Sequence, residues 1–279
     1  MTFEDVLLLP SHVIGRCLDC GLMVNLSFPQ RTPTAVFDAS YHGDAQSLAF
    51  ADAGFGIEDP SRGIWEHGLR VAETLTAGRR LLDVGAARGS FVALARSRGW
   101  DAQGVELSAD AAESAQTDHG LPVAPGTIDV MPSDPVFDAI TIWDVLEHVT
   151  DVAATLRAAK TRLAPNGVVI LTTDNFDSLI ADLARSAYAL TGRRVAFPAA
   201  RFFIPYNTVY FTPESLRGVL RQQDLHTVYS QGIDYPEVKM NLSLPERVVT
   251  RVLYAAGRKS GRESQMLLAA KQIDSPTHV

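Results

Sequence analysis

The stretch LLDVGAARGSF, residues 81–91, places one acid and two glycines directly after an apolar run. Asp83 stands near the end of that run, and Gly85 and Gly89 follow it four residues apart. Glycines let a backbone approach a ligand closely, and the N–H groups that begin the next helix point into the crevice where open α/β sheets bind ligands. The spacing therefore predicts a binding site for a nucleotide-like ligand.

A second acid, Glu106, ends the next apolar run, seventeen residues after Gly89. A carboxylate at that position can accept hydrogen bonds from both hydroxyls of a ribose. Nicotinamide dinucleotides use the same geometry, but their fingerprint is G-x-G-x-x-G. Counted from Gly85, this chain has Ala87 and Ser90 where the second and third glycines should be. A dinucleotide site is therefore the weaker interpretation.

Electrostatics separates the two kinds of cofactor further. Asp83, two residues before Gly85, would repel a pyrophosphate but would stabilise the α-ammonium of a methionine moiety. We therefore predict S-adenosylmethionine as the cofactor and S-adenosylhomocysteine as its product. A nicotinamide-dependent oxidoreductase and a non-catalytic module with this fold stay open as alternatives.

Several further motifs follow in the order in which one enzyme family carries them. Residues 64–174 resemble the small-molecule branch of the class I S-adenosylmethionine-dependent methyltransferases, whose members read D-x-G-x-G-x-G and, later, F-D followed by L-E-H-V. Phe137 and Asp138 match the F-D pair, and residues 143–149 read WDVLEHV. Residues 207–216, NTVYFTPESL, are similar to the family's H-x-Y-Y-F-T-P-E-S-L, with Asn207 in place of a frequent histidine.

The resemblance implies a methyl transfer and a set of cofactor contacts around the loop, the ribose, the adenine and the methionine end. The predicted cofactor-binding residues are Asp83, Gly85, Ala87, Gly89, Glu106, Leu107, Thr127, Ile128, Trp143 and Asp144. Trp143 or Tyr41 could face the sulfonium through a cation–π contact, although either ring could equally be packing.

Two residues are candidates for a catalytic role, His148 and Tyr41. His148 follows the predicted fourth strand, and an ordinary histidine pKa suits a general base near neutral pH. A histidine that only hydrogen-bonds the local backbone is the alternative. Glu147 is expected to brace the loop. By analogy of fold, the acceptor is a hydroxyl oxygen of a sugar-like or secondary metabolite in a biosynthetic reaction, with N- or C-methylation as the alternative.

These residues can meet only if the strands that precede them lie side by side. Apolar runs alternate with helical patterns from Ile64 onward, which predicts a doubly wound, Rossmann-like α/β fold. Its seven-stranded sheet should be mostly parallel with an antiparallel last strand. The predicted strands are 81–84, 102–107, 121–124, 137–142, 168–172, 225–229 and 265–271. The predicted helices follow at about 64–78, 91–98, 108–119, 152–163, 178–190 and from 212.

This pattern divides the chain into four parts. Residues 1–60 form an N-terminal appendage, 61–175 the cofactor-binding core, 176–211 a helical and aromatic lid, and 212–279 the C-terminal part of the core sheet. The lid holds three arginines that could grip an acidic substrate group or could simply be solvated. They are Arg193, Arg194 and Arg201.

Cys17 and Cys20 resemble the second half of a zinc ribbon that precedes this core in some relatives. A closed zinc site needs four ligands, and only His12 and His42 could complete one here. We expect a remnant knuckle and no bound metal.

Charge and composition limit the partners. A formal net charge of −7 disfavours nucleic acid, which binds basic surfaces. No apolar run approaches the eighteen residues of a membrane span, and the first residues lack the basic start of a signal peptide. The sequence thus favours a cytoplasmic enzyme acting on a small molecule, and it is compatible with a homodimer.

Overall fold

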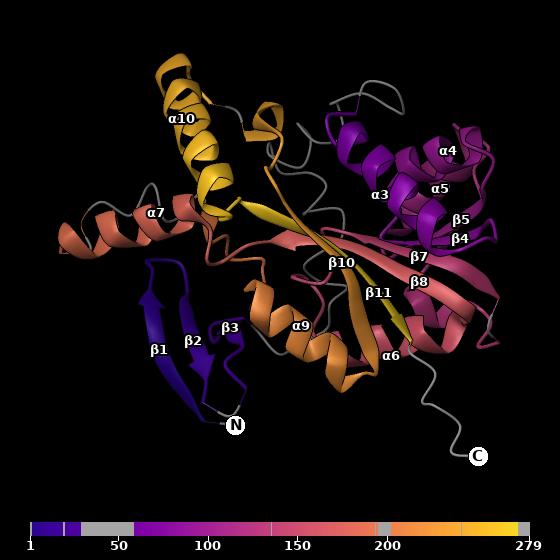
Figure 1. Ribbon diagram of the computed structural model, residues 1–279, viewed down its shortest axis with the longest axis horizontal. Coiled ribbons are helices and arrows are strands. Elements are labelled where there is room, and N and C mark those ends of the chain that lie inside the picture. The colour runs from indigo at the N-terminus through magenta and orange to yellow at the C-terminus, as the bar shows by residue number, and fades with distance from the viewer. Residues whose placement is uncertain are drawn as a thin grey trace.

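A seven-stranded sheet forms the centre of the computed structural model, which describes residues 2–18, 20–28, 59–134, 136–192, 194, 202–240 and 242–272. The strand order is β10-β11-β8-β7-β4-β5-β6 (Figure 1). The strands are β4 Arg80–Val84, β5 Asp101–Glu106, β6 Val123–Pro125, β7 Phe137–Trp143, β8 Leu163–Asp174, β10 Leu225–Ile233 and β11 Gln265–Gln272.

Strand direction confirms the predicted fold class. β4 pairs in parallel with both β5 and β7, and the parallel pairing continues to β6 and β8. β11 is antiparallel to both of its neighbours, β8 and β10. The sheet is therefore Rossmann-like and mostly parallel. Its last strand in the chain, β11, lies between β8 and β10 and runs antiparallel to both.

Helices cover both faces of this sheet (Figure 1). One apolar cluster joins the sheet to α3 (Arg62–Leu75), α4 (Ser90–Ser97) and α5 (Ala109–Thr117). Another joins it to α6 (Val152–Arg162) and α9 (Pro213–Gln222). Within β8, Val168 and Ile170 belong to the first cluster, and Val169 and Leu171 to the second. Because successive side chains of β8 enter apolar layers on opposite faces of the sheet, this part of the strand is continuously apolar.

Side-chain caps begin the helices near where the sequence predicts them. The Ser108 hydroxyl accepts a hydrogen bond from the Ala111 N–H at the start of α5. Thr212 and Ser215 cap α9 reciprocally, and Pro213 occupies its first turn. These caps satisfy N–H groups that have no partner inside the helix.

The N-terminal residues form strands that the sequence analysis missed. β1 (Phe3–Leu8), β2 (Val13–Cys17) and β3 (Met23–Asn25) make an antiparallel sheet with β9 (Val209–Tyr210), a segment far along the chain. A third apolar cluster joins this sheet to α7 (Leu179–Leu190) and to the segment before β9. The N-terminal segment and the predicted lid therefore share one core. Their boundaries as separate domains stay a prediction.

Another missed element is α10 (Leu244–Ser260), which packs against α7 (Figure 1). Its signals were present in the sequence, because Ser243 and Glu246 form a capping box and Gly261 ends the helix at a φ of 67°. A serine followed three residues later by a glutamate, with a glycine after the last turn, is typical of helix boundaries.

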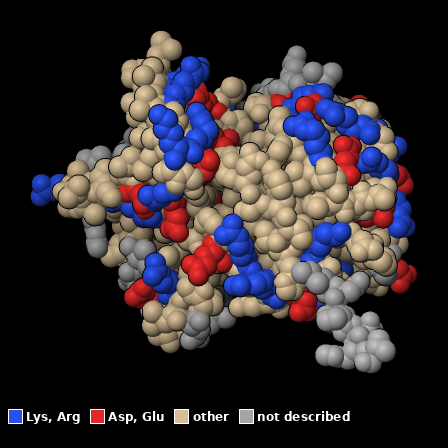
Figure 2. Space-filling view, in the orientation of Figure 1, with Lys and Arg blue, Asp and Glu red and all other residues tan. Residues whose placement is uncertain are grey.

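The surface charge and the lengths of the helices relate to two expectations from the sequence, that the chain binds no nucleic acid and that it spans no membrane. On the face drawn in Figure 2, acidic and basic side chains are interspersed and do not separate into one broad basic area. Within the described parts of the chain, no helix has both the length and the apolar character needed to cross a membrane.

The helical layer over the sheet gives a stability prediction. Leu156 of α6 is fully buried in the core, so Leu156→Ala should lower the free energy of unfolding by about 2–5 kcal/mol, because truncation leaves a cavity. Leu190, which is 88 % exposed at the end of α7, provides the control, since Leu190→Ala should change stability by less than about 0.5 kcal/mol. Urea unfolding of both variants measures this, and equal losses would contradict the packing described above.

Candidate active site

The loop between β4 and α4 has the backbone that its glycines predict. Gly85, Ala87 and Gly89 all have left-handed φ values, of 78°, 47° and 86°. A Cβ on Gly85 would lie 2.4 Å from a methyl carbon of Val145, so a larger residue does not fit there. The N–H groups of Gly85 and Ala86 donate to the Val105 carbonyl of β5. The loop is thereby held tightly across the ends of two strands.

Glu106 lies at the end of β5, where the sequence places it, and its side chain is fixed by the backbone. One carboxylate oxygen accepts from the Ala87 N–H and the other from the Ser108 N–H, both at 2.8 Å. Each carboxylate oxygen has a second lone pair, so the group can still accept hydrogen bonds from a diol. Glu106 therefore links the glycine loop to the start of α5 and fits a ribose contact.

Asp83 is buried in the sheet beneath this loop. Its Oδ1 accepts a hydrogen bond of 2.7 Å from the Thr141 hydroxyl of β7. Burial raises the pKa of Asp83 to about 8; the Thr141 hydrogen bond opposes this rise, and the charge of Glu106 adds to it. Among the described residues, no lysine or arginine forms an ion pair with Asp83. A buried carboxyl without a cation suits a ligand that brings a positive charge, as a methionine ammonium does.

The residues predicted to contact the adenine and the residue predicted to contact the sulfonium have different neighbours. Ile128 is buried after β6, and the Thr127 hydroxyl donates to Asp129. Leu107 is half-buried after Glu106. Trp143 packs edge-on against Phe91 of α4, with ring centroids 5.1 Å apart. This contact supports the packing role that the sequence left open for Trp143.

His148 departs from the prediction in one respect. Its Nδ1 lies 3.4 Å from the Tyr206 carbonyl, and its backbone N–H donates to Val145. Burial lowers the pKa of His148 to about 4, although the Tyr206 carbonyl opposes this shift. The expectation of a pKa near neutral is therefore wrong. At neutral pH the ring is uncharged and able to accept a proton, but it is a weaker base than an exposed histidine.

The structure brings further carboxyls to the same edge of the sheet. Asp144 and Glu147 were named from the sequence, whereas Asp174 was missed. Asp144 directly follows β7 and Asp174 ends β8. Both accept hydrogen bonds of 3.2 Å from the amide nitrogen of Gln265. Glu147 is buried nearby, and its backbone carbonyl accepts hydrogen bonds from the N–H and the hydroxyl of Thr208. The bracing role of its side chain stays a prediction. Asp174 could have been found, since it ends an apolar strand as Glu106 does.

Burial is the main cause of raised pKa values at these three carboxyls. The pKa of Asp174 rises to about 7 through burial and through the charge of Asp144, while Gln265 lowers it. The pKa of Glu147 rises well above its ordinary value because of burial and of its two acidic neighbours. Burial also raises the pKa of Asp144, against the hydrogen bond from Thr172. Negative charge at this edge is thus poorly compensated.

Other predicted residues do not join this edge or cannot be placed. Tyr41, His42, Arg193 and Arg201 lie outside the described residues. Cys17 is buried and Cys20 is exposed. In the described parts of the chain, no three or more histidine, cysteine, aspartate or glutamate side chains are grouped so that they could hold a metal ion.

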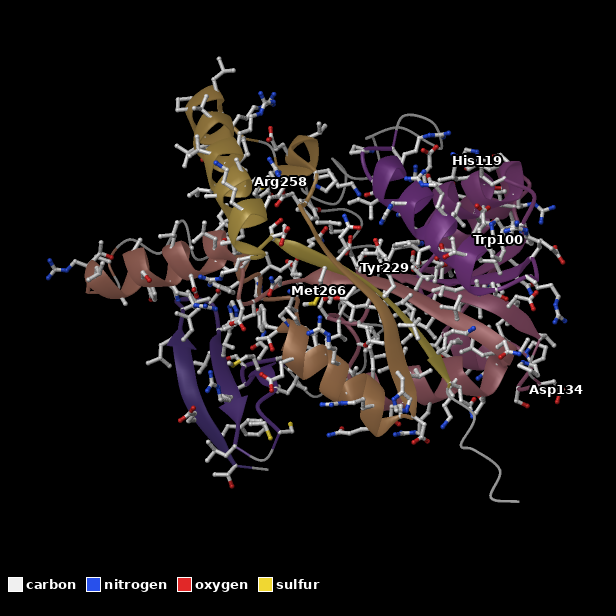
Figure 3. The ribbon with its side chains drawn as sticks, in the orientation of Figure 1. Trp100, His119, Asp134, Tyr229, Arg258 and Met266 are labelled. Carbon is white, nitrogen blue, oxygen red and sulfur yellow. The ribbon has the colours of Figure 1, made fainter. Side chains whose placement is uncertain are left out.

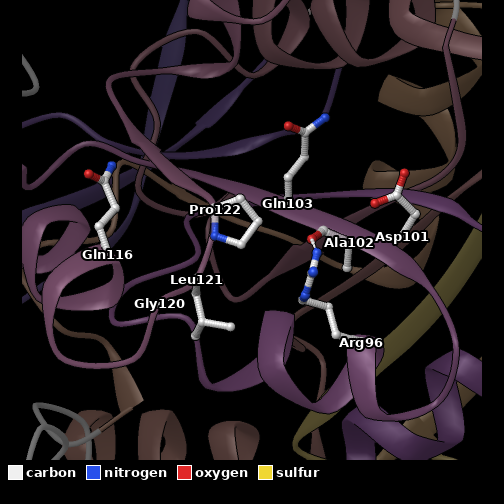
Figure 4. A pocket seen from close by; sticks show the side chains of 8 residues that line it. All are labelled: Arg96, Asp101, Ala102, Gln103, Gln116, Gly120, Leu121 and Pro122. Carbon is white, nitrogen blue, oxygen red and sulfur yellow. Dashed lines mark hydrogen bonds between the residues drawn. The ribbon is translucent and has the colours of Figure 1, made fainter.

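A pocket of about 530 Å³ lies at the other end of the sheet. Its lining includes Arg96, Asp101, Gln103 and Gln116 (Figure 4). Asp101 begins β5, whereas Glu106 ends it. This pocket is therefore separate from the edge that holds the glycine loop and the carboxyls.

Comparison with known proteins identifies the family. A model of the family described as "Methyltransferase domain" matches residues 61–230. The chain is 40 % identical over 114 residues to a ubiquinone biosynthesis O-methyltransferase of Methylococcus capsulatus, covering 37 % of this chain and about half, 47 %, of that protein. It is 32 % identical over 195 residues to a ubiquinone biosynthesis O-methyltransferase of Chromobacterium violaceum, covering 65 % of this chain and 79 % of that protein.

A solved structure shows the same fold. The SAM-dependent methyltransferase from Archaeoglobus fulgidus superimposes with a TM-score of 0.51 at 17 % identity, covering 75 % of this chain and 93 % of that one. With the family match, the glycine loop and the antiparallel β11, this decides against the nicotinamide-dependent alternative. The chain belongs to the methyltransferase-domain family and is a class I S-adenosylmethionine-dependent methyltransferase.

Proposed function

We propose that this enzyme methylates a hydroxyl oxygen of a small sugar-like or secondary metabolite. The observation that carries the proposal is the juxtaposition of Glu106 and the glycine loop with the segment from Asp144 to His148, on the adjacent strands β5, β4 and β7. One side of this edge suits the cofactor, and the other offers a base. The two relatives from Methylococcus capsulatus and Chromobacterium violaceum are O-methyltransferases, which supports oxygen as the acceptor atom.

The proposed cofactor contacts are made by side chains at this edge of the sheet. Glu106, with Leu107 beside it, would accept the ribose hydroxyls, and Thr127 and Ile128 would flank the adenine. Asp83 would balance the methionine ammonium beneath the loop of Gly85, Ala87 and Gly89, with Trp143 and Asp144 at the methionine end. S-adenosylmethionine supplies a methyl group on a positively charged sulfur, which is intrinsically reactive toward nucleophiles.

The protein therefore has to orient the acceptor, exclude water and remove a proton. When His148 Nδ1–H donates to the Tyr206 carbonyl, the basic lone pair of the ring is on Nε2. This nitrogen would take the hydroxyl proton as the acceptor oxygen attacks. Tyr41, outside the described residues, keeps its proposed place beside the sulfonium.

The ribose contact can be tested by calorimetry. Glu106→Ala should weaken the binding of S-adenosylhomocysteine about 10- to 100-fold, because a hydrogen bond to a charged group contributes about 1.5–3 kcal/mol. Glu113 is exposed on α5, and Glu113→Ala is the control that should bind normally. Unchanged affinity in Glu106→Ala would remove this residue from the cofactor site.

Binding of the cofactor should depend on pH through Asp83. Its pKa of about 8 leaves it mostly protonated at pH 7, and an ammonium beside it favours the ionised form. Affinity for S-adenosylhomocysteine should therefore rise as pH increases toward about 8, with release of close to one proton at pH 7. Titrations in buffers of different ionisation enthalpy measure this release, and Asp83→Asn should abolish it. Binding without proton release in the unmodified enzyme would contradict the proposed ammonium contact.

The proposed base predicts a separate loss. His148→Ala should lower turnover about 10²- to 10⁴-fold on hydroxyl acceptors and leave S-adenosylhomocysteine affinity unchanged. Because the base acts in its neutral form and its pKa is about 4, turnover of the unmodified enzyme at saturating S-adenosylmethionine should fall only as pH drops toward that value. His119→Ala, at an exposed position after α5 (Figure 3), is the control. Full activity in His148→Ala would reduce this histidine to a structural role.

A further inference from the structure

Asp144, the first residue after β7, has a backbone conformation that other residues must support. Its φ of 53° lies in the left-handed region, which aspartate enters more readily than most residues but still at a cost. The segment after it depends on this turn. Val145 lies against Gly85 of the glycine loop, and its carbonyl accepts a hydrogen bond of 2.9 Å from the His148 N–H. The conformation of Asp144 therefore sets how this segment meets the loop.

Side chains from two other strands hold Asp144. The Thr172 hydroxyl of β8 accepts from the Asp144 N–H at 3.2 Å and donates to Asp144 Oδ1 at 2.8 Å, so it fixes both the backbone and the carboxyl group. The Gln265 amide nitrogen of β11 donates at 3.2 Å to the same Oδ1 and to Asp174 Oδ1. Thr172 and Gln265 are 2 % and 1 % exposed. The central sheet thus determines where both donors lie.

These hydrogen bonds leave one oxygen of the Asp144 carboxyl group for a ligand. Oδ1 accepts from both donors, whereas Oδ2 accepts no hydrogen bond from the residues that the structure describes. Asp144 is only half-buried, unlike the two residues that hold it. An ionised carboxylate can only accept hydrogen bonds, so Oδ2 suits a charged donor such as the methionine ammonium.

Packing alone does not explain the polar atoms of Thr172 and Gln265. Apolar side chains fill the neighbouring buried positions of both strands, at Leu171 of β8 and at Met266 and Leu267 of β11. Burying a hydroxyl or an amide costs free energy unless its hydrogen bonds are satisfied. Valine and methionine would therefore fill these two positions at least as well if shape were the only requirement. The polar atoms are explained by the turn that they hold.

We propose that Thr172 and Gln265 are positioning residues for the methyl transfer. They hold the turn at Asp144 so that its carboxyl group binds the methionine end of S-adenosylmethionine, and neither of them touches the cofactor. This inference rests on the proposed function, in which Asp144 contacts the methionine end. It gives β11, the antiparallel strand, a part in cofactor binding.

Two ligands that differ only at the methionine end test this inference. S-adenosylhomocysteine carries the α-ammonium, whereas 5′-methylthioadenosine has the same adenosine and sulfur but no amino-acid group. In calorimetric titrations, Thr172→Val and Gln265→Met should each weaken S-adenosylhomocysteine binding about 10-fold, as the loss of about one hydrogen bond does, and change 5′-methylthioadenosine binding less than about twofold. Thr172→Ser keeps the hydroxyl and should bind both ligands as the unmodified enzyme does.

Thr227→Val is the matched control. Thr227 lies in β10 of the same sheet, and its buried hydroxyl has no hydrogen-bond partner among the described residues. This variant also exchanges a strand threonine for valine but removes no contact with Asp144. Its affinity for both ligands should therefore equal that of the unmodified enzyme.

The outcomes separate a positioning role from a structural one. Equal weakening of both ligands in Thr172→Val and Gln265→Met, or a larger loss in Thr172→Ser than in Thr172→Val, would show that these side chains only stabilise the sheet and would overturn the inference. Full S-adenosylhomocysteine affinity in Thr172→Val or in Gln265→Met removes that residue from the positioning role.

A further variant separates this inference from the proposed function. If Asp144→Ala weakens S-adenosylhomocysteine binding but Thr172→Val and Gln265→Met do not, the inference alone is wrong. If Asp144→Ala binds with full affinity, the proposed contact of Asp144 is refuted and the inference with it. None of these titrations contains an acceptor, so the hydroxyl acceptor and the role of His148 succeed or fail on the turnover measurements described above.

Discussion

Parallel pairing of β4 with its two neighbours is the constraint on which the rest of the structure depends. It places the carboxyl ends of β5, β4 and β7 at one edge, so that the loop after Val84, the carboxylate of Glu106 and the segment after Trp143 become neighbours. The register adds detail, since Asp83 pairs with Thr141 and their side chains form a hydrogen bond. Helices on both faces bury this sheet and keep the edge rigid.

The same burial creates the chemistry of the edge. Taking a carboxyl out of water disfavours its ionised form, which is why the pKa values of Asp83 and Asp174 rise to about 8 and about 7. A site built in this way favours ligands that bring positive charge. Burial has the opposite effect on His148, whose pKa falls to about 4, because its charged form is the cation.

The small N-terminal sheet borders this edge of the central sheet. Tyr210 of β9 donates to the Ile204 carbonyl and accepts from His12 Nε2 at 2.8 Å, so a residue near the N-terminus supports one from the predicted lid. The Tyr188 hydroxyl of α7 donates to the Leu8 carbonyl. Burial raises the pKa of Tyr210, and the charge of Asp174 adds to this rise. The N-terminal segment is therefore integrated with the segment around β9.

Local signals explain how much the sequence could predict. The apolar run before Asp83, the glycines after it and the acid at Glu106 lie within about thirty residues, and their conformations depend mainly on neighbours in the chain. The caps at Ser108 and Thr212 are local in the same sense. The sequence by itself therefore determined the α/β fold, the conformation of the glycine loop and the place of Glu106 at the end of β5.

Contacts between distant residues were decided only by the tertiary structure. Gln265 and Asp174 are 91 positions apart, and their meeting depends on the antiparallel entry of β11 beside β8. The pairing of β3 with β9 and the lowered pKa of His148 likewise depend on which surfaces bury one another. Sequence periodicity shows that a side chain is buried or exposed, but register and desolvation are properties of the assembled sheet.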